Sequence, residues 1–305
     1  MKNLFHRARD LWAPDRLGAF YQLSHRLSLG LTAQRRGLRT TTLPWGLSIC
    51  VDVEDIIGRT IWNTGVYELG VSEAIWRLLD PGDTALDIGA NIGYMTSIMA
   101  LRVGPGGSVN SFEPHPGVCR TLRENLRLFR RDPRTCSVEL HETALGSENA
   151  KAPLVTQANW AENQGTARFV DQRPTLANEA EVNMRRLDDL ISARPVALAK
   201  LDVEGYETPV LMGAERLIDS QCIRTLIYED HTAHGGEPRT LLEAAGYTVY
   251  LLDRSRNGLL LRQPDSRPTF RNEATNFVAT LVPSQVQERL SPPGWRLLDR
   301  RFQAC

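Results

Sequence analysis

Short apolar runs alternate with longer amphipathic segments along the chain from residue 84 onwards. This alternation is typical of an α/β protein, in which a parallel sheet is joined by crossover helices. One predicted helix carries a single apolar stripe, because Val118, Leu122, Leu126 and Phe129 recur every three or four positions. Other helices are predicted at 94–103, 209–218 and 241–245, and seven strands at 84–88, 108–112, 137–140, 196–201, 225–228, 248–252 and 277–281.

The segment before residue 84 has a less regular pattern. Residues 1–40 contain short apolar groups at near-helical spacing, which predict one or two small helices. Apolar and β-branched residues at 47–53 and 60–62 predict a short hairpin. A further helix, predicted at 72–79, ends at the turn Asp80-Pro81-Gly82-Asp83.

A long polar stretch at residues 147–186 separates the third predicted strand from the fourth. It is longer than an ordinary connection, so we expect it to hold extra strands, at 167–170 and 182–187, and to cover the substrate site. The predicted organisation is therefore an extension of helices and a hairpin at 1–66, followed by one main domain at 67–305 that contains this insertion.

Charge and composition narrow the classes of partner. The net charge of the 305 residues is zero, so the whole molecule offers no strong field for nucleic acid or an anionic membrane. Residues 1–40 are an exception, with eight Lys or Arg against two Asp. A solvated helical face is the simplest interpretation of this arm, and contact with a membrane surface or an acidic carrier protein is the alternative.

The cysteines and the hydropathy pattern indicate the compartment. The five cysteines show no CxxC spacing and no matching histidine cluster, which argues against a disulfide framework or a zinc site. No apolar run approaches the roughly 20 residues of a membrane span, and charges interrupt the first thirty residues. We therefore expect a cytoplasmic protein without a membrane span, and we leave a homo-oligomer open.

A glycine turn follows the first strand of the main domain. In the run from Asp87 to Tyr94, Gly89 and Gly93 let the backbone turn tightly and approach a ligand closely. Ligands of open parallel sheets bind at the carboxyl ends of the strands, where the strand order reverses. A dinucleotide fingerprint would need glycine where Asn91 and Tyr94 stand, which argues against a pyrophosphate. A nucleoside with an amino-acid part fits instead, with Asp87 beside its ammonium or sulfonium end.

The second strand ends in an acidic residue. Glu113 follows Gly89 by twenty-four positions and can accept two hydrogen bonds from a ribose diol, which are strengthened by its charge. Pro114 stops the strand after it, and we count Pro114 among the predicted cofactor contacts. The glycine turn and the acidic strand end together predict a nucleoside site.

These residues resemble the FkbM family of class I methyltransferases over roughly residues 66–282. The resemblance rests on the segments 87–94, 111–116 and 200–207, the last of which is similar to the family's K-x-D-V-E-G-x-E signature. It implies a doubly wound, Rossmann-like seven-stranded sheet whose last inserted strand is antiparallel. It also implies S-adenosylmethionine as the cofactor and a hydroxyl of a small metabolite, such as a sugar or polyketide, as the methyl acceptor.

The resemblance also assigns the cofactor contacts. It places Asp87, Gly89, Asn91, Gly93 and Glu113 against the cofactor. Around its methionine and adenine ends it places Glu68 and the segment from Glu142 to Ala144. Residues 1–60 and 147–186 have no such support, so we expect them to select the substrate.

The end of the fourth strand carries the predicted chemistry. Methyl transfer to an alcohol needs a nucleophile held near the methyl carbon and a group that removes its proton. We expect Asp202 and Glu204 to position the acceptor, and His231, at the end of the next strand, to act as the base. Alternatively, Glu204 and Glu207 cap the following helix, and His231 is an ordinary loop residue.

Other functions and cofactors compete with this interpretation. One alternative is a nicotinamide-dependent oxidoreductase, and the residues Asn91 and Tyr94 argue against it. Another is a nucleoside-binding regulatory or assembly domain without turnover, and the cluster of acidic residues near strands four and five argues against it. Asp202, Glu229 and Asp230 offer oxygen ligands that Mg²⁺ prefers, but their spacing defines no coordination set, so no metal is predicted.

Overall fold

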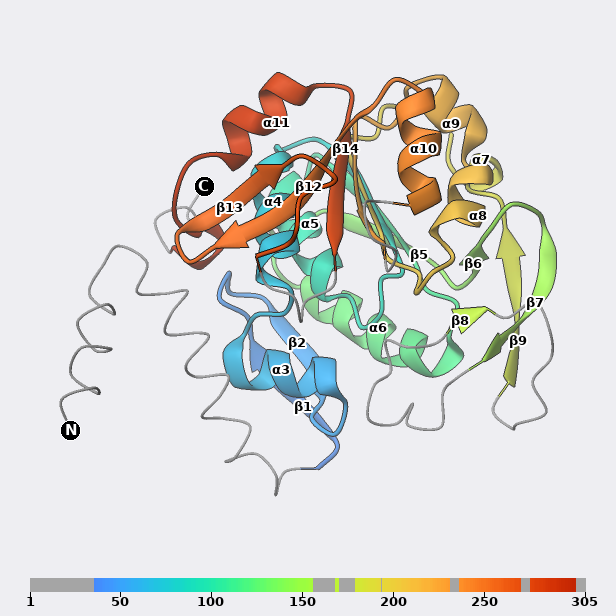
Figure 1. Ribbon diagram of the computed structural model, residues 1–305. Helices are drawn as coiled ribbons and strands as arrows, with labels where there is room; N and C mark the ends of the chain where they lie inside the picture. Colours follow the sequence, from blue (N-terminus) through green and yellow to red (C-terminus); the bar gives the residue numbers. More distant parts are fainter. Residues whose placement is uncertain are drawn as a thin grey trace.

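A mixed sheet of eight strands forms the centre of the protein (Figure 1). The computed structural model describes residues 36–155, 168–169, 179–192, 194–230, 236–269 and 275–299. In spatial order the strands are β13 (Gly258–Arg262), β12 (Thr248–Ser255), β14 (Asn276–Thr280), β11 (Thr225–Glu229), β10 (Leu198–Leu201), β3 (Thr84–Ile88), β4 (Ser108–Phe112) and β5 (Ser137–His141).

Strand direction and order identify the edge of the sheet where a ligand can bind. Strands β11, β10, β3, β4 and β5 are parallel, whereas β14 runs antiparallel to both of its neighbours, β11 and β12. From β3 the chain moves outward to β4 and β5, then returns to β10 on the other side of β3. The strand order therefore reverses between β3 and β10, the point at which open sheets of this kind bind ligands.

Helices cover both faces of the sheet over two separate hydrophobic cores (Figure 1). One core includes α4 (Leu69–Leu78), α5 (Tyr94–Val103), α6 (Pro116–Phe129) and α11 (Pro283–Leu290). The other includes α7 (Leu187–Leu190), α8 (Glu207–Met212), α9 (Glu215–Asp219) and α10 (Gly236–Ala244). The predicted doubly wound sheet with an antiparallel inserted strand is confirmed.

Two elements of the main domain differ from prediction. The helix predicted at 209–218 is divided into α8 and α9 at Gly213, which packs so closely on Gly146 that an added Cβ would lie 2.0 Å from its carbonyl oxygen. The second difference is an eighth strand, β13, which pairs antiparallel with β12 and was not predicted.

The hairpin predicted from residues 47–53 and 60–62 is wrong in its second strand. Strand β2 (Ser48–Asp52) pairs instead with β1 (Leu38–Thr42), and residues 60–62 lie in α3 (Ile56–Thr64). The side chain of Asp55 caps this helix by accepting from the backbone N–H of Gly58. Burial of Ile57 and Ile61, four positions apart on one face, outweighs the local strand preference of the segment.

The N-terminal segment packs directly on the main domain. The indole Nε1–H of Trp45 donates to Ser97 Oγ in α5 at 3.2 Å. Asn125 in α6 accepts from the backbone N–H of Cys50 at 2.6 Å and donates to its carbonyl oxygen at 2.9 Å. The hairpin and α3 therefore share a core with α5 and α6. The small helices predicted nearer the N-terminus, and most of the basic arm, lie outside the described residues.

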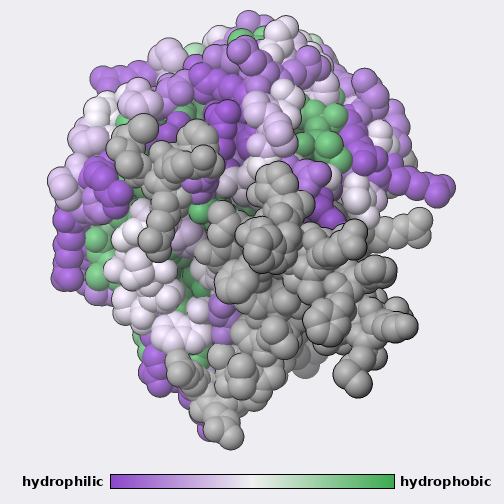
Figure 2. Space-filling model, turned by 90° about the vertical axis from the view of Figure 1, so that its left-hand side faces the viewer, coloured by the Kyte–Doolittle hydropathy of each residue, from purple (hydrophilic) through white to green (hydrophobic). Residues whose placement is uncertain are grey.

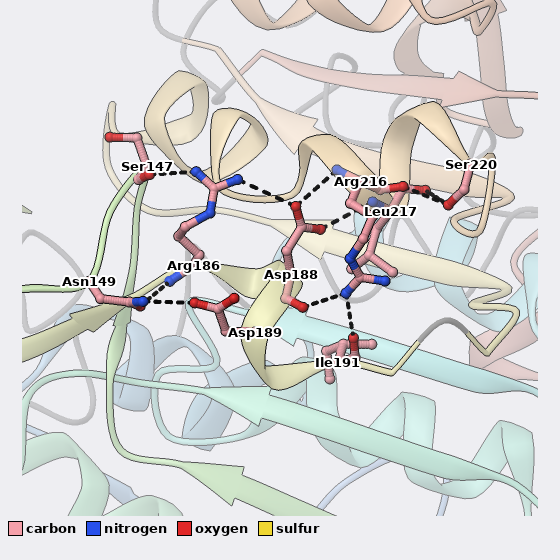
Figure 3. A network of polar contacts seen from close by, with 9 residues as sticks. All are labelled: Ser147, Asn149, Arg186, Asp188, Asp189, Ile191, Arg216, Leu217 and Ser220. Atoms are coloured by element: carbon pink, nitrogen blue, oxygen red, sulfur yellow. Dashed lines mark hydrogen bonds and ion pairs between the residues drawn. The ribbon is translucent and has the colours of Figure 1, made fainter.

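The predicted insertion at 147–186 supplies three strands of a second, four-stranded sheet, and β6 (Ala144–Leu145), just before it, supplies the fourth. The spatial order of this sheet is β6, β9 (Glu179–Arg185), β7 (Ala150–Val155) and β8 (Arg168–Phe169), so the extra strands predicted there are present. Asp188 ties the insertion to the main domain, because its carboxylate accepts from the backbone N–H groups of Arg216 and Leu217 at the start of α9 (Figure 3). Arg186 reaches back to the carbonyl oxygen of Ser147 at 2.7 Å.

Hydrophilic residues cover most of the described surface on the face shown in Figure 2, and hydrophobic residues appear there only in small separate areas. Within the described part of the chain, no helix combines the length and apolar character that crossing a membrane requires.

Candidate functional site

A cavity that is partly open to solvent lies at the carboxyl ends of β3, β4 and β10. Residues that follow these three strands form most of its wall. The small sheet adds Ala144, Leu145 and Leu154, so the insertion does contribute to the wall of the cavity. The cavity therefore occupies the place where the strand order reverses.

The glycine turn forms the wall next to β3. Gly89, Asn91 and Gly93 all have left-handed backbone conformations, with φ of 80°, 49° and 88°. A Cβ on Gly89 would lie 1.8 Å from the carbonyl oxygen of Asp202, so only glycine fits there. Gly93 begins α5, and all three residues either line the cavity or border it directly.

Glu113 braces this turn from the end of β4. Its carboxylate accepts from the backbone N–H of Asn91 at 3.0 Å and from that of His115 at 2.8 Å. Burial raises the pKa of Glu113 to about 7, against the opposing effect of these hydrogen bonds. Glu113 and Pro114 both line the cavity, and their contact with a ribose stays a prediction.

Asp87 lies beneath the cavity and is not part of its lining. The side chain is fully buried, and its Oδ2 accepts from Thr96 Oγ1 at 2.5 Å. Burial raises the pKa of Asp87, whereas Lys200, its register partner on β10, lowers it. Among the described residues the other oxygen, Oδ1, has no hydrogen-bond partner. Direct contact between Asp87 and a cofactor stays a prediction.

The wall next to β10 is built from charged side chains. Lys200 and Asp202 project from the same face, and Lys200 Nζ lies 2.9 Å from Asp202 Oδ2. Burial by itself lowers the pKa of Lys200. The carboxylates of Asp202, Asp87 and Glu68 raise it by a larger amount, so the pKa lies above its usual value and the lysine stays charged. Glu204, which also lines the cavity, has a left-handed backbone with φ of 55°.

Three carboxylates converge behind this wall. One oxygen each of Glu68, Asp202 and Glu229 lie within 4.8 Å of one another. This group differs from the three acids considered as oxygen ligands in the sequence, because Glu68 takes the place of Asp230. Burial, followed by the charges of Asp202 and Glu68, raises the pKa of Glu229 to about 9. Glu68 and Asp202 are half-buried and Glu229 is buried, and no metal is assigned to this group.

The remaining predicted site residues have different positions. Ala144 lines the cavity, but Glu142 points away from it and forms an ion pair at 2.7 Å with Arg123 on the surface. Glu207 accepts from the backbone N–H groups of Val203 and Gly205 in the turn after β10. This structural role resembles the helix-capping role considered as its alternative. His231 lies outside the described residues.

Tyr67 and Lys200 line the cavity although the sequence did not mark them as site residues. The backbone N–H of Tyr67 donates to Tyr94 Oη at 3.0 Å, and the two rings meet edge to face with centroids 6.2 Å apart. Lys200 had a usable signal, because residues two apart on a strand share a face and Asp202 was already predicted. Tyr67 had no such signal, since it precedes α4 and reaches the cavity only through tertiary packing.

Comparison with known proteins gives the family. The family described as "Methyltransferase FkbM domain" matches residues 87–249. "Methyltransferase 1" of Beauveria bassiana (strain ARSEF 2860) is 30% identical over 192 residues, covering 55% of this chain and 74% of the relative. "31-O-demethyl-FK506 methyltransferase FkbM" of Streptomyces tacrolimicus is 33% identical over 201 residues, covering 56% of this chain and 75% of the relative.

Solved structures give weaker matches. The crystal structure of "Methyltransferase FkbM" from Methylobacillus flagellatus KT aligns at 18% identity with a TM-score of 0.43, over 67% of this chain. The alignment spans 47% of that longer chain, or about half its length.

The sheet order, the glycine-turn cavity and these relatives define an S-adenosylmethionine-dependent methyltransferase. Within that class, the chain belongs to the FkbM methyltransferase family. The cavity suits the cofactor, because Gly89 leaves room for a tight turn where an added Cβ would clash with the backbone of Asp202, and Glu113 presents to the cavity a carboxylate that can accept from ribose hydroxyls.

Proposed function

We propose that this protein methylates a hydroxyl oxygen of a small metabolite such as a sugar, a polyketide or another natural product. The observation that carries the proposal is the Lys200–Asp202 pair on the cavity wall. The ammonium of Lys200 holds Asp202 as a carboxylate, and this carboxylate faces the cavity opposite the glycine turn. A hydroxyl group is a natural donor to such an acceptor.

Some cavity residues would bind the cofactor, and others would position the methyl acceptor. Gly89, Asn91, Gly93 and Glu113 would hold the nucleoside part of the cofactor. S-adenosylmethionine, when bound, supplies an electrophilic methyl group on a positively charged sulfur. Asp202 would accept a hydrogen bond from the acceptor hydroxyl and orient its oxygen for in-line attack.

Electrostatics also favour the acidic wall as the acceptor side. Positive charge moves towards the acceptor oxygen as the new bond forms. Asp202 and Glu204 are preorganised on that wall and stabilise the charge where it develops, which is the main way in which enzymes lower such barriers. The role of His231 as the base remains a prediction.

One relative supports a hydroxyl acceptor. The name of the Streptomyces tacrolimicus protein describes methylation of an oxygen of demethylated FK506. A place in secondary metabolism and in the cytoplasm is part of the same proposal, as is a small molecule rather than a nucleic acid as the acceptor.

Calorimetry and product detection test the function. We expect S-adenosylmethionine and S-adenosylhomocysteine to bind and NAD not to bind. Incubation with labelled S-adenosylmethionine and a panel of hydroxylated natural products is expected to give a product that carries one added methyl group on oxygen. Binding of NAD alone would overturn the assignment, and cofactor binding without any methylated product would favour a regulatory domain.

Two substitutions test the chemistry. Asp202→Ala and His231→Ala are expected to abolish methyl transfer while leaving cofactor affinity within about threefold, because both act on the acceptor. Glu139→Ala, on an exposed side chain of β5, is the matched control and should behave as the wild type. If turnover survives both substitutions, the assignment of the acidic wall to the acceptor is wrong.

A further inference from the structure

Strand register places Glu229 directly beside Asp202. Strands β10 and β11 are parallel with Leu201 opposite Tyr228, so the next pair along is Asp202 and Glu229. Neighbouring strands lie about 4.8 Å apart, and residues in register point to the same face. Glu229 is 8% exposed and does not line the cavity, whereas Asp202 does. The two side chains are hydrogen-bonded to each other.

One carboxylate oxygen of each residue lies within 4.8 Å of the other, and burial together with the charge of Asp202 raises the pKa of Glu229 to about 9, so the pair holds one proton at neutral pH. Lys200 decides which of the two carries the charge. Its ammonium lies 2.9 Å from Asp202 Oδ2, so the negative charge stays on Asp202. The other carboxylates that act on Glu229 are Glu68, ahead of α4, and Glu204, after β10, and both oppose a second charge there.

We propose that Glu229 is a positioning residue for methyl transfer: as a neutral acid it donates a hydrogen bond to Asp202 and, with Lys200, fixes the carboxylate that orients the acceptor. This inference rests on the proposed function of the same cavity. It adds a residue that never touches the acceptor and acts only through Asp202. The chain Lys200–Asp202–Glu229 is then one unit, with a donor on each side of the central carboxylate.

This arrangement determines what Asp202 can do. A carboxylate that already accepts from an ammonium and from a carboxylic acid binds a further proton poorly, because both donors stabilise its charged form. It remains a good acceptor of a hydrogen bond from a hydroxyl. Asp202 therefore orients the acceptor, and the proton of the hydroxyl leaves to another group.

Infrared difference spectroscopy tests the protonation of Glu229 without any acceptor. At pH 7 the spectrum of the wild type minus that of Glu229→Gln is expected to show the carbonyl band of one protonated carboxylic acid. This band should be replaced by carboxylate bands as the pH rises through about 9. The matched control, Glu139→Gln, removes an exposed carboxylate and should show no acid band at pH 7.

A second variant covers the case in which Glu229→Gln does not fold. Asp202→Asn places a neutral amide beside Glu229, so Glu229 should lose its proton at a lower pH than in the wild type. An acid band that is absent from the wild-type difference at pH 7, or a titration that Asp202→Asn leaves unchanged, would overturn the proposal. Neither result depends on methyl transfer, so failure here is distinct from failure of the proposed function.

The pH profile of turnover tests the positioning role. Glu229→Gln keeps a neutral donor, so its rate at pH 7 should stay within about threefold of the wild type, whereas Glu229→Leu should lose about 30-fold or more. The wild-type rate should fall as the pH rises through about 9, and Glu229→Gln should abolish that fall. Equal losses in the Gln and Leu variants would indicate a merely structural role and contradict the proposal.

Discussion

The two ends of the cavity are built by different means. At the β3 end the wall is backbone, shaped by glycine and by left-handed turns, and Glu113 braces it through main-chain N–H groups. At the β10 end the wall consists of charged side chains held by one another. The first end should therefore be sensitive to added volume, and the second to changes of charge. Substitutions at each end, with a matched control elsewhere, test this difference.

The largest effect is expected at the charged end. Lys200→Met removes the ammonium that faces Asp202 and Asp87, and breaking a buried ion pair destabilises a protein by about 3–5 kcal/mol. The control Lys151→Met breaks an exposed pair with Glu181 and should cost less than about 0.5 kcal/mol. Urea unfolding measures both. Similar losses in the two variants would mean that the charged end is no more sensitive than the surface.

The glycine end should respond to a single methyl group. Gly89→Ala is expected to cost about 2–4 kcal/mol of folding stability, from its left-handed backbone and from the clash with Asp202, and to abolish cofactor binding. Gly82→Ala isolates the backbone effect, because Gly82 has φ of 87° but open space around it, and should cost about 1–2 kcal/mol. Calorimetry measures cofactor binding, and urea unfolding measures the stability of both variants. Normal cofactor binding by Gly89→Ala would refute the assignment of this wall.

A smaller effect is expected at Glu113. If Glu113 accepts from the ribose hydroxyls as proposed, Glu113→Gln replaces charge-assisted hydrogen bonds with neutral ones, and affinity for S-adenosylmethionine should fall about 10-fold. Because the ionised form is the better acceptor, wild-type affinity should rise as the pH increases through about 7, and the variant should show no such rise. A pH-independent affinity of the wild type would exclude Glu113 from the ribose site.

Folding stability gives an independent check on Glu113. Its pKa in the folded protein is raised to about 7, so the folded chain holds a proton that the unfolded chain releases above about pH 4.5. The contribution of Glu113 to stability is therefore fully present below about pH 4.5 and declines as the pH rises to about 7. Glu113→Gln should remove that part of the pH dependence in thermal unfolding.

The smallest effect tests a residue that the structure places outside both ends. Glu142→Ala breaks an exposed ion pair with Arg123, which should cost less than about 0.5 kcal/mol and leave cofactor affinity within twofold. Calorimetry decides the matter. A tenfold loss of affinity would restore Glu142 to the cofactor contacts implied by the family resemblance.

Much of the fold could be predicted because local signals agree with the tertiary structure in the main domain. The strand at 84–88 is an apolar run that ends at a glycine turn, and the helix at 94–103 begins directly after it. Strand β13 was missed although Asn257-Gly258 is a common hairpin signal between two apolar runs; in the structure Arg256 and Asn257 form the turn, and Gly258 pairs with Ser255. Residues 60–62 were misassigned because their strand preference is overridden by packing of α3.

The site was only partly predictable for a related reason. The glycine turn and Glu113 are fixed by positions next to strand ends, which the sequence shows. The convergence of Glu68, Asp202 and Glu229 depends on three separate elements and on strand register, so spacing along the chain cannot reveal it. Glu142 illustrates a second limit. Its position near a strand end can be seen in the sequence, but that position does not decide whether its side chain faces the cavity or solvent.

The insertion of β14 between β11 and β12 sets a limit on how the protein can be dissected. The family match ends at residue 249, yet the strand that fills the middle of this half of the sheet comes from residues 276–280. Beyond it, Arg77 and Glu73 of α4 hold the chain at Pro292, Gly294, Arg296 and Leu297 by hydrogen bonds. A fragment trimmed to residues 87–249 would leave the edge of β11 unpaired, cut β12 after its second residue, and lose the hydrogen bonds made by Glu73 and Arg77. Recombination with relatives therefore has to exchange segments that run well past those boundaries.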